Sequence, residues 1–470
     1  MSAKLGAKVR GIRRREGLTQ VQLAERLGIS PSYLNLIEHN RRPLPAPLLI
    51  KLAQLFQLDL QAFAAEDDQE LTSSLLEAFG DPVFEPYELT SQEVQELVTQ
   101  TPNVARAVLA LYGAFRRSHL LDTDQPIDEE GAPPSPSEEV SDLIQRHGNF
   151  FPELEDGAEA LWRTARLQTK NMQHDLVEYL RAVHGFDVQI VPEQELSNRV
   201  RRIDRANQKI HLSEVLAPRS INFQLAHVVG LFEQSEALDR LCGDQLLTSD
   251  ESRRLGRVAL ANYFAGAVLM PYDAFFSASE ELRCDVELLG HRFRTSFEQV
   301  CHRLTTLRRP GKEGVPLHLL RVDIAGNVSK RFSASGFRFA RFGGSCPRWN
   351  EHAAFLTPGM IRTQISQMPD GSYYFSVARV LRTSRGGFKG SHALYAIGIG
   401  CELQHAGRLV YADGVDLDEL ELAVPIGTSC PSCPRSTCDQ RAFPASFKPM
   451  RIDEDVRGTS FYVVDTDGNG

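Results

Sequence analysis

The stretch GLTQVQLAERLGISPSYLNLIEHNRRP, residues 17–43, predicts two short helices joined by a tight turn. Thr19 is a favourable N-cap residue, and Gln22 follows at the spacing of a capping box. Gly28 permits a sharp turn, and Ser30 with Pro31 is typical of a second helix start. Each helix has one apolar, inward face, formed by Leu23, Ala24 and Leu27 in the first helix and by Leu34 and Ile37 in the second.

Helix, glycine turn and helix is the helix-turn-helix arrangement, in which the second helix enters the major groove of DNA. Residues 5–60 resemble the phage-repressor-like (Xre/Cro) family through the pattern T-Q-x-x-L-A…G-[IV]-S…I-E…R-x-P. The resemblance implies a double-stranded DNA operator. A lone helix-turn-helix binds weakly, so we expect a homodimer or higher homo-oligomer that reads two half-sites. The resemblance also implies phosphate contacts by Gln20, Asn40, Arg41 and Arg42, and positions near base edges for Ser30, Ser32, Tyr33 and Asn35. A helical bundle with an accidental pattern is the alternative.

The charge distribution along the chain supports a polyanionic partner for the N-terminal segment, which we call the head. Residues 1–60 carry ten Lys and Arg against four Asp and Glu, whereas residues 61–160 carry four against 22. The composition, 42% hydrophobic and 24% charged, is that of a soluble globular protein. The N-terminus lacks an apolar signal core, and the most apolar stretch, residues 258–272, is too short for a membrane span. Eight cysteines are too few for a disulfide scaffold, so we expect a cytoplasmic protein without membrane contact.

Composition divides the chain into five segments. Residues 1–65 form the head, and residues 66–120 read as a helical connector or dimerisation segment. Residues 121–137, LDTDQPIDEEGAPPSPS, are acidic and proline-rich and predict a flexible linker. Residues 138–310 mix helices with strands near 186–191, 200–206 and 208–214. Residues 311–470 are rich in short strands, including a hairpin over 323–332.

The middle segment contains FQLAHVVGLFEQ, residues 223–234, which has the apolar character of a metallopeptidase helix. An H-E-x-x-H helix needs a glutamate and a second histidine, but His227 is followed by Val228, Val229, Gly230 and Leu231. The order of elements resembles the ImmA/IrrE peptidase-like family, whose acidic third zinc ligand is also absent, because no Asp or Glu lies between Ser252 and Tyr272. We therefore expect no enzyme. His227 is either a buried structural histidine or a polar landmark in an apolar effector cleft with Val228 and Leu231.

Near the C-terminus, GTSCPSCPRSTCDQRAFP places Cys430, Cys433 and Cys438 close together. Three thiols at this spacing predict a metal site, with structural zinc as the leading interpretation and an iron–sulfur cluster or free thiols as the alternatives. We expect Cys346 to be the fourth ligand, with His352 as the alternative.

From the linker onward the chain resembles the short-chain fatty acyl-CoA transcriptional regulators. The stretches that carry this resemblance include RCDVELLGHRFRTSFEQVCHRLTTL, FRFARFGGSCPRWNEHAAF, MPDGSYYFSVARV and VPIGTSCPSCPRSTCDQRAFP. The resemblance implies a cytoplasmic regulator of carbon and carboxylic-acid metabolism genes, with an acyl-CoA such as propionyl-CoA or acetyl-CoA as effector. The fold expected is multidomain: an all-α helix-turn-helix head, an α+β ImmA/IrrE-like middle domain (a degenerate zincin), and a β-rich α+β C-terminal domain with a metal-type cysteine cluster.

Coenzyme A carries several phosphate charges, and a short acyl group needs a small apolar pocket. SKRFSASGFRFARFGG interleaves basic and aromatic residues, so Arg331, Phe337, Arg338 and Arg341 are candidate ligand contacts. A strand with one wet and one packed face would give the same pattern. Two other classes of function stay open: an Xre regulator that senses redox state or metal through the cysteines, and an enzyme tethered to DNA.

Overall fold

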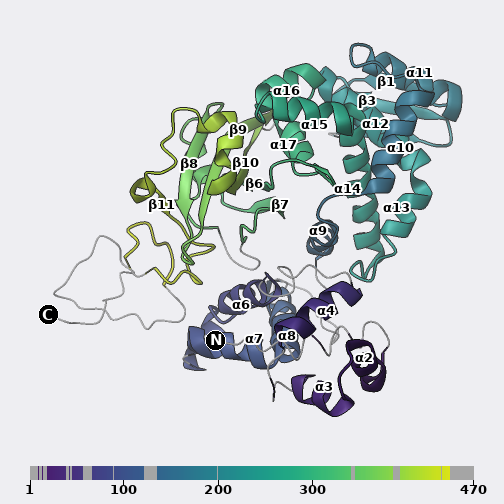
Figure 1. Ribbon diagram of the computed structural model, residues 1–470. Helices are drawn as coiled ribbons and strands as arrows, with labels where there is room; N and C mark the ends of the chain where they lie inside the picture. Colours follow the sequence, from purple (N-terminus) through teal and green to yellow (C-terminus); the bar gives the residue numbers. More distant parts are fainter. Residues whose placement is uncertain are drawn as a thin grey trace. The chain divides into compact units, whose positions relative to one another are not determined.

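The structure is a computed structural model that describes residues 9, 13, 18–38, 42, 45–56, 66–87, 89–120, 135–197, 199–339, 345–384, 392–435 and 437–444 (Figure 1). The described residues up to 119 belong to one compact unit and those from 120 onward belong to a second. We call them the head unit and the body, and describe each by itself. Among the described helices, none is both long and apolar enough to cross a bilayer.

The head unit begins with the predicted helix pair, α2 (Gln20–Leu27) and α3 (Pro31–Glu38), followed by α4 (Ala46–Phe56). The capping box of Thr19 and Gln22 is present, and Gly28 ends α2 in the left-handed conformation at φ 71°. The expected inward residues are buried together with Leu52 of α4. Local sequence signals and apolar burial therefore agree in this part of the chain.

Helices also form the rest of the head unit, as predicted: α6 (Glu66–Ala78), α7 (Ser91–Gln100) and α8 (Pro102–Leu120), with a 3₁₀ turn η1 (Pro82–Tyr87). Their shared core contains Leu71, Leu75, Val94, Val98 and Ala105. Most of the predicted linker lies outside the described residues. Its last three residues differ from the prediction, because Ser135 caps a helix with Glu138 and Pro136 takes the first helical position.

The first half of the body is helical around a small sheet. Helices α9 (Pro136–Arg146), α10 (Pro152–Thr164) and α11 (Met172–His184) precede strands β1 (Asp187–Val191), β2 (Arg201–Asp204) and β3 (Lys209–Ser213). The strand order is β1-β3-β2, parallel between β1 and β3 and antiparallel between β3 and β2. A 3₁₀ turn η2 (Glu193–Leu196) follows β1, and helices α12 (Pro218–Glu233), α13 (Ser235–Leu241) and α14 (Asp250–Leu269) complete this half.

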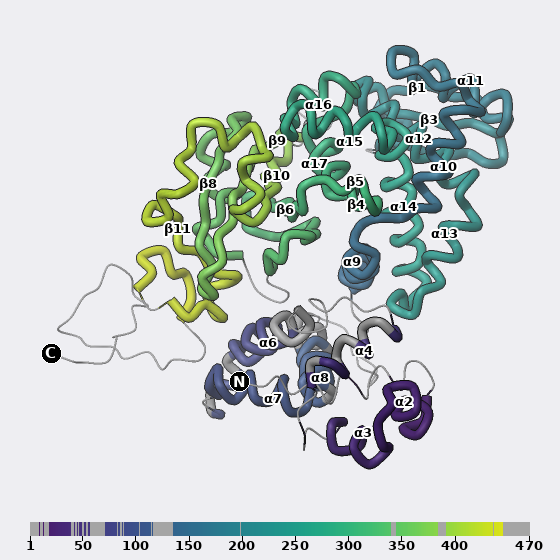
Figure 2. The backbone as a smooth tube through the Cα atoms, viewed as in Figure 1, coloured from purple at the N-terminus to yellow at the C-terminus, as the bar shows by residue number. Residues whose placement is uncertain are grey.

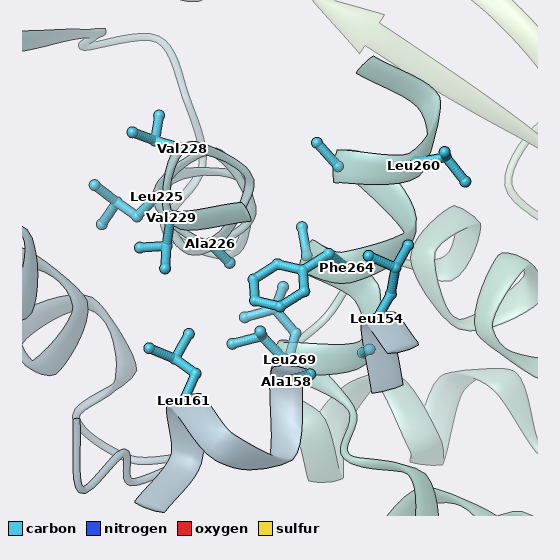
Figure 3. Close-up of a cluster of buried hydrophobic side chains, with 14 of the residues drawn as sticks. Leu154, Ala158, Leu161, Leu225, Ala226, Val228, Val229, Leu260, Phe264 and Leu269 are labelled. Carbon is cyan, nitrogen blue, oxygen red and sulfur yellow. The ribbon is translucent and has the colours of Figure 1, made fainter. Parts of the chain in front are cut away.

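Helices α12 and α14 pack closely at Gly230. A Cβ atom built there would lie 2.7 Å from Cδ1 of Phe264, so glycine is required for this approach. Figure 3 shows Ala226 and Val229 of α12 in one buried cluster with Phe264 of α14. Gly230, which stands at the fourth position of the H-E-x-x-H pattern, is thus a packing residue.

The second half of the body joins three helices to a sheet. Helices α15 (Tyr272–Glu281), α16 (Val286–Phe293) and α17 (Phe297–Leu304) lead through a small hairpin, β4 (Arg308–Arg309) and β5 (Lys312–Glu313), into the sheet (Figure 2). The sheet has the order β11-β8-β9-β10-β6-β7. Its strands are β6 (His318–Asp323), β7 (Val328–Ser333), β8 (Ile361–Gln367), β9 (Tyr373–Ser384), β10 (His392–Glu402) and β11 (Val424–Pro425). The predicted hairpin is β6–β7.

Alternation along β6 shows what covers each face of this sheet. Leu319 packs in the cluster that contains helices α15 to α17, whereas Leu320 and Val322 pack with Trp349 and Cys346 on the other face. Short elements on the chain after β7 complete the fold: α18 (Asn350–Ala354) and the 3₁₀ turns η3 (Leu403–Arg408), η4 (Val410–Ala412) and η5 (Leu420–Leu422).

Candidate functional site

Helix α3, the expected recognition helix, is held against α2 by a buried carboxylate. Glu38 is 1% exposed and accepts two bonds from Arg13, at 2.6 and 3.0 Å. Gln20 donates to Glu38 at 2.8 Å and to Asn35 Oδ1 at 3.4 Å. Gln20 therefore positions α3 and the Asn35 amide. The sequence alone did not predict this role.

The predicted DNA contacts divide by location. Ser32, Asn35 and Arg42 are exposed and Tyr33 is half-buried, whereas Asn40 and Arg41 lie outside the described residues. Ser30 is the N-cap of α3, since its Oγ accepts from the Tyr33 amide at 3.2 Å. Ser32 and Asn35 thus lie on the face of α3 opposite Leu34 and Ile37, and the half-buried Tyr33 lies at the edge of the buried face.

His227 of α12 is buried at 3% exposure, and its ring is engaged by the neighbouring strand. Nη1 of Arg201 lies 2.8 Å from Nδ1, and since a guanidinium only donates, Nδ1 is the acceptor. Burial, followed by the charge of Arg201, lowers the pKa of His227 to about 4, against a backbone hydrogen bond at Val258 that raises it. The imidazole is therefore neutral at pH 7, and a guanidinium occupies the nitrogen that faces β2.

A cavity of about 1770 Å³ lies between the two halves of the body. We call it the basic cavity. Its walls come from the start of α11, the start of α12, helices α16 and α17, and strands β6, β9 and β10. Six Lys and Arg side chains line it against two Glu: Lys170, Arg219, Arg294, Arg321, Arg379 and Arg382 against Glu287 and Glu298.

Two helix N-termini open into the basic cavity. Helix α11 begins after Asn171 and α12 after Ala217, and neither N-cap residue donates or accepts a side-chain cap bond. Free backbone N–H groups at a helix start attract anions. Positive side chains and two uncapped helix starts together make this wall suitable for phosphate groups.

Carboxylates and aromatic rings position two of the cavity's arginines. Arg379 donates to Glu287 at 2.7 Å and lies over the Phe297 ring, and Arg321 lies 4.1 Å from the centre of the Tyr395 ring. Arg321 also donates to Glu298 at 3.2 Å. Burial opposes ionisation of Glu298, but the charges of Lys330, His302 and Arg321 outweigh it and lower its pKa to about 2.

A second cavity of about 600 Å³ adjoins the first. Both are lined by Ser220, Ser296, Glu298 and Arg321. Most of the rest of its wall comes from α9, α14, α17 and strands β6 and β7. We call it the side cavity.

The predicted ligand residues are not brought together. Arg331 lines the side cavity, but His227, Val228 and Leu231 line neither cavity, and Val228 is fully buried in the core. Phe337 stacks on buried His318 at 4.4 Å between ring centres. Arg338 lies 4.0 Å from Asp370, and Arg341 lies outside the described residues. The basic cavity could not be predicted from the sequence, because its residues come from segments far apart in the chain.

The four predicted cysteines line one small cavity on the sheet face opposite α15 to α17. His352 is not among its wall residues and lies 2.7 Å from Ser345 Oγ. Backbone N–H groups of Gly427 and Ala442 donate to Cys346 and Cys430 at 3.5 and 3.4 Å. Burial raises the pKa of Cys346 to about 11. In the described part of the chain, no three His, Cys, Asp or Glu side chains are grouped so that they could hold a metal ion.

A helix-turn-helix and a separate body with a large basic cavity define the class of DNA-binding transcriptional regulators with an effector domain. Residues 306–462 match the short-chain fatty acyl coenzyme A regulator C-terminal domain, residues 181–305 the IrrE N-terminal-like domain, and residues 9–63 a helix-turn-helix.

Three relatives match over nearly the whole chain. The HTH-type transcriptional regulator PrpR of Mycobacterium tuberculosis is 38% identical over 96% of this chain and 94% of its own. RamB of the same species is 40% identical over 98% of both chains, and the propionyl-CoA carboxylase regulator of Cereibacter sphaeroides is 40% identical over 99% and 100%. A solved Mycobacterium tuberculosis transcriptional regulator aligns with a TM-score of 0.66 and 41% identity, over 70% of this chain and 99% of that one. The chain belongs to the short-chain fatty acyl-CoA regulator family of helix-turn-helix transcriptional regulators.

Proposed function

We propose that this regulator binds a double-stranded DNA operator under the control of a short-chain acyl-CoA, of the propionyl-CoA or acetyl-CoA class, which occupies the basic cavity. The observation that carries the proposal is the convergence of six cationic side chains and two uncapped helix N-termini on one cavity. Phosphates of coenzyme A require such a wall, and Tyr395 and Phe297 offer rings beside it. A regulator of this kind works in the cytoplasm, where the DNA is, and controls carbon and carboxylic-acid metabolism genes.

Calorimetric titration with CoA, acetyl-CoA and propionyl-CoA tests this proposal. Arg219→Glu and Arg382→Glu reverse exposed charges on the cavity wall, so each should weaken binding of every CoA compound by about tenfold or more. Arg254→Glu is the matched control, because Arg254 is an exposed arginine of α14 that lines neither cavity. If the unaltered protein binds no CoA ester, the proposal is wrong.

The operator contacts form a second part of the proposal. We propose that Ser30, Ser32, Tyr33 and Asn35 lie near base edges and that Gln20, Asn40, Arg41 and Arg42 contact the backbone. The exposed face of α3 and its anchoring through Glu38 support these roles. One recognition helix reads one half-site, so we also propose a homodimer, which sedimentation of the protein with and without operator DNA would test.

We also propose a structural zinc held by Cys346, Cys430, Cys433 and Cys438, although these side chains are not grouped as metal ligands in the described part of the chain. Its support is the shared small cavity and the two N–H···S contacts, which suit thiolate sulfur. Metal analysis of the purified protein tests it: about one zinc per chain is expected. Iron with visible absorbance would instead favour an iron–sulfur cluster and the redox-sensing alternative. If the protein contains neither zinc nor iron, the cysteines are free thiols.

We propose no peptidase activity for the middle domain. Both the glutamate and the second histidine of H-E-x-x-H are aliphatic here, and Nδ1 of His227 is taken by Arg201. A peptidase assay with added zinc tests this, and turnover that His227→Ala abolishes would contradict it.

A further inference from the structure

The side cavity has a mostly apolar wall. Helix α14 contributes Leu255, Ala259, Gly266 and the polar Asn262, which recur at helical spacing along one face. Leu255 and Val258 of this helix are 39% and 44% exposed, so apolar side chains reach the cavity's outer edge. The other large apolar wall residues are Val140, Ile144, Phe151, Phe223, Leu260, Leu319 and Phe332.

Three of the four cationic side chains on this wall, those of Arg303, Arg321 and Lys330, are paired with carboxylates, and Arg331 is the fourth. Lys330 and Arg321 both lie near Glu298, at 3.0 and 3.2 Å. Arg303 makes a two-bond pair with Glu155, and both side chains are 1% exposed. A second negative charge on a ligand would compete with these carboxylates, whereas a hydrocarbon chain would need no partner.

The side cavity and the basic cavity share part of their walls. Ser220 and Ser296, near the starts of α12 and α17, line both together with Glu298 and Arg321, so the shared boundary is polar, and the large apolar residues belong to the side cavity alone. A CoA thioester has the same order of chemistry: charged phosphates, then amides and a thioester, then hydrocarbon.

We infer that the side cavity receives the acyl chain of the CoA thioester held in the basic cavity, and that it accepts chains of six to eight carbons as well as short ones. This inference rests on the proposed acyl-CoA function. A cavity of about 600 Å³ lies within the size range of sites that enclose an entire drug-sized molecule, which is far more than a three-carbon group fills. The family's defining ligands therefore leave most of this space unused.

Gly266 determines how much room the side cavity leaves for the acyl chain of the ligand. It lies on the cavity-lining face of α14, and a Cβ built there meets no atom within 4 Å. A larger side chain at this position would extend into the cavity without displacing the core. Leucine also has a higher helix propensity than glycine, so Gly266→Leu should not weaken α14.

Titration of the full-length protein with CoA, propionyl-CoA, hexanoyl-CoA and octanoyl-CoA tests the inference. Each buried methylene should tighten binding about fourfold, so hexanoyl-CoA should bind on the order of 50-fold more tightly than propionyl-CoA. Gly266→Leu should remove at least about tenfold of the hexanoyl-CoA affinity and leave CoA unchanged. Val258→Asp should act in the same direction, whereas Val183→Asp, on an exposed valine of α11 that lines neither cavity, should change nothing.

The two proposals fail in different ways. Binding of propionyl-CoA without a gain for hexanoyl-CoA, or a Gly266→Leu series that matches the unaltered protein, would overturn the acyl-chain assignment and leave the acyl-CoA function standing. Absence of binding by any CoA compound would overturn both.

Discussion

Bonds that shape the helix-turn-helix join residues close in sequence, whereas bonds that shape the body join residues far apart. Thr19 caps α2 through Gln22, three residues away, and Arg13 holds Glu38 across 25 positions. In the body, Glu155 pairs with Arg303 across 148 positions, and Gln145 donates to the Ser333 carbonyl across 188. The head motif can therefore be read locally, but the body and its cavities exist only when distant segments pack.

Loss of the long-range ion pair should have the largest effect. Arg303→Met leaves Glu155 buried without its cation, so we expect about 3–5 kcal/mol less stability of the body in chemical denaturation. The double variant Glu155→Leu with Arg303→Met should recover much of the loss, because no buried charge remains. A loss below about 1 kcal/mol in the single variant would show that this pair does not hold the two halves together.

A pH dependence should come from His227, whose folded pKa of about 4 lies below the ordinary 6.5. The unfolded chain takes up a proton that the folded chain refuses, so stability is complete above pH 6.5 and falls as pH drops from 6.5 toward 4. The total is about 3 kcal/mol at 1.36 kcal/mol per pKa unit. His227→Gln should flatten this part of the stability curve, and His392→Gln, at an exposed histidine, should not. Equal slopes for the two variants would contradict the assignment.

Two glycines offer a matched pair for the packing between α12 and α14. Gly230→Ala places a methyl 2.7 Å from Phe264 and should cost about 1–3 kcal/mol, partly offset by the better helix propensity of alanine. Gly266→Ala meets nothing within 4 Å and should gain about 0.5–1 kcal/mol. Thermal unfolding of both variants measures the difference, and equal melting temperatures would mean that α12 can shift away from Phe264.

The smallest effects should come from the head. Arg42→Ala should weaken binding across DNA sequences and lower the salt slope by about 1. Asn35→Ala or Tyr33→Ala should instead remove about 1 kcal/mol of sequence discrimination. Competition binding at several salt concentrations separates the two classes, and identical behaviour would show that α3 is not the recognition helix.

Much of the fold could be predicted because its signals are periodic or local. The capping box at Thr19 and the glycine turn at Gly28 each depend on neighbours within a few positions. The sequence also showed that the metal ligands expected around His227 are absent. The contact of Arg201 with His227 was not predicted, because it depends on how strand β2 packs against helix α12.

Sequence by itself determined that this chain carries a helix-turn-helix head, a middle domain without the peptidase ligands, and a strand-rich end with clustered cysteines. Only the tertiary structure decided where a ligand-sized space exists. Arg219, Arg294 and Arg382 follow no common motif, and they meet at one cavity because α11, α12, α16 and the sheet pack around it. Val228 and Leu231 suggested an apolar cleft, yet Val228 is buried in the core and Leu231 packs, partly buried, against it. An apolar sequence pattern does not distinguish a cleft from a core until the helices are in place.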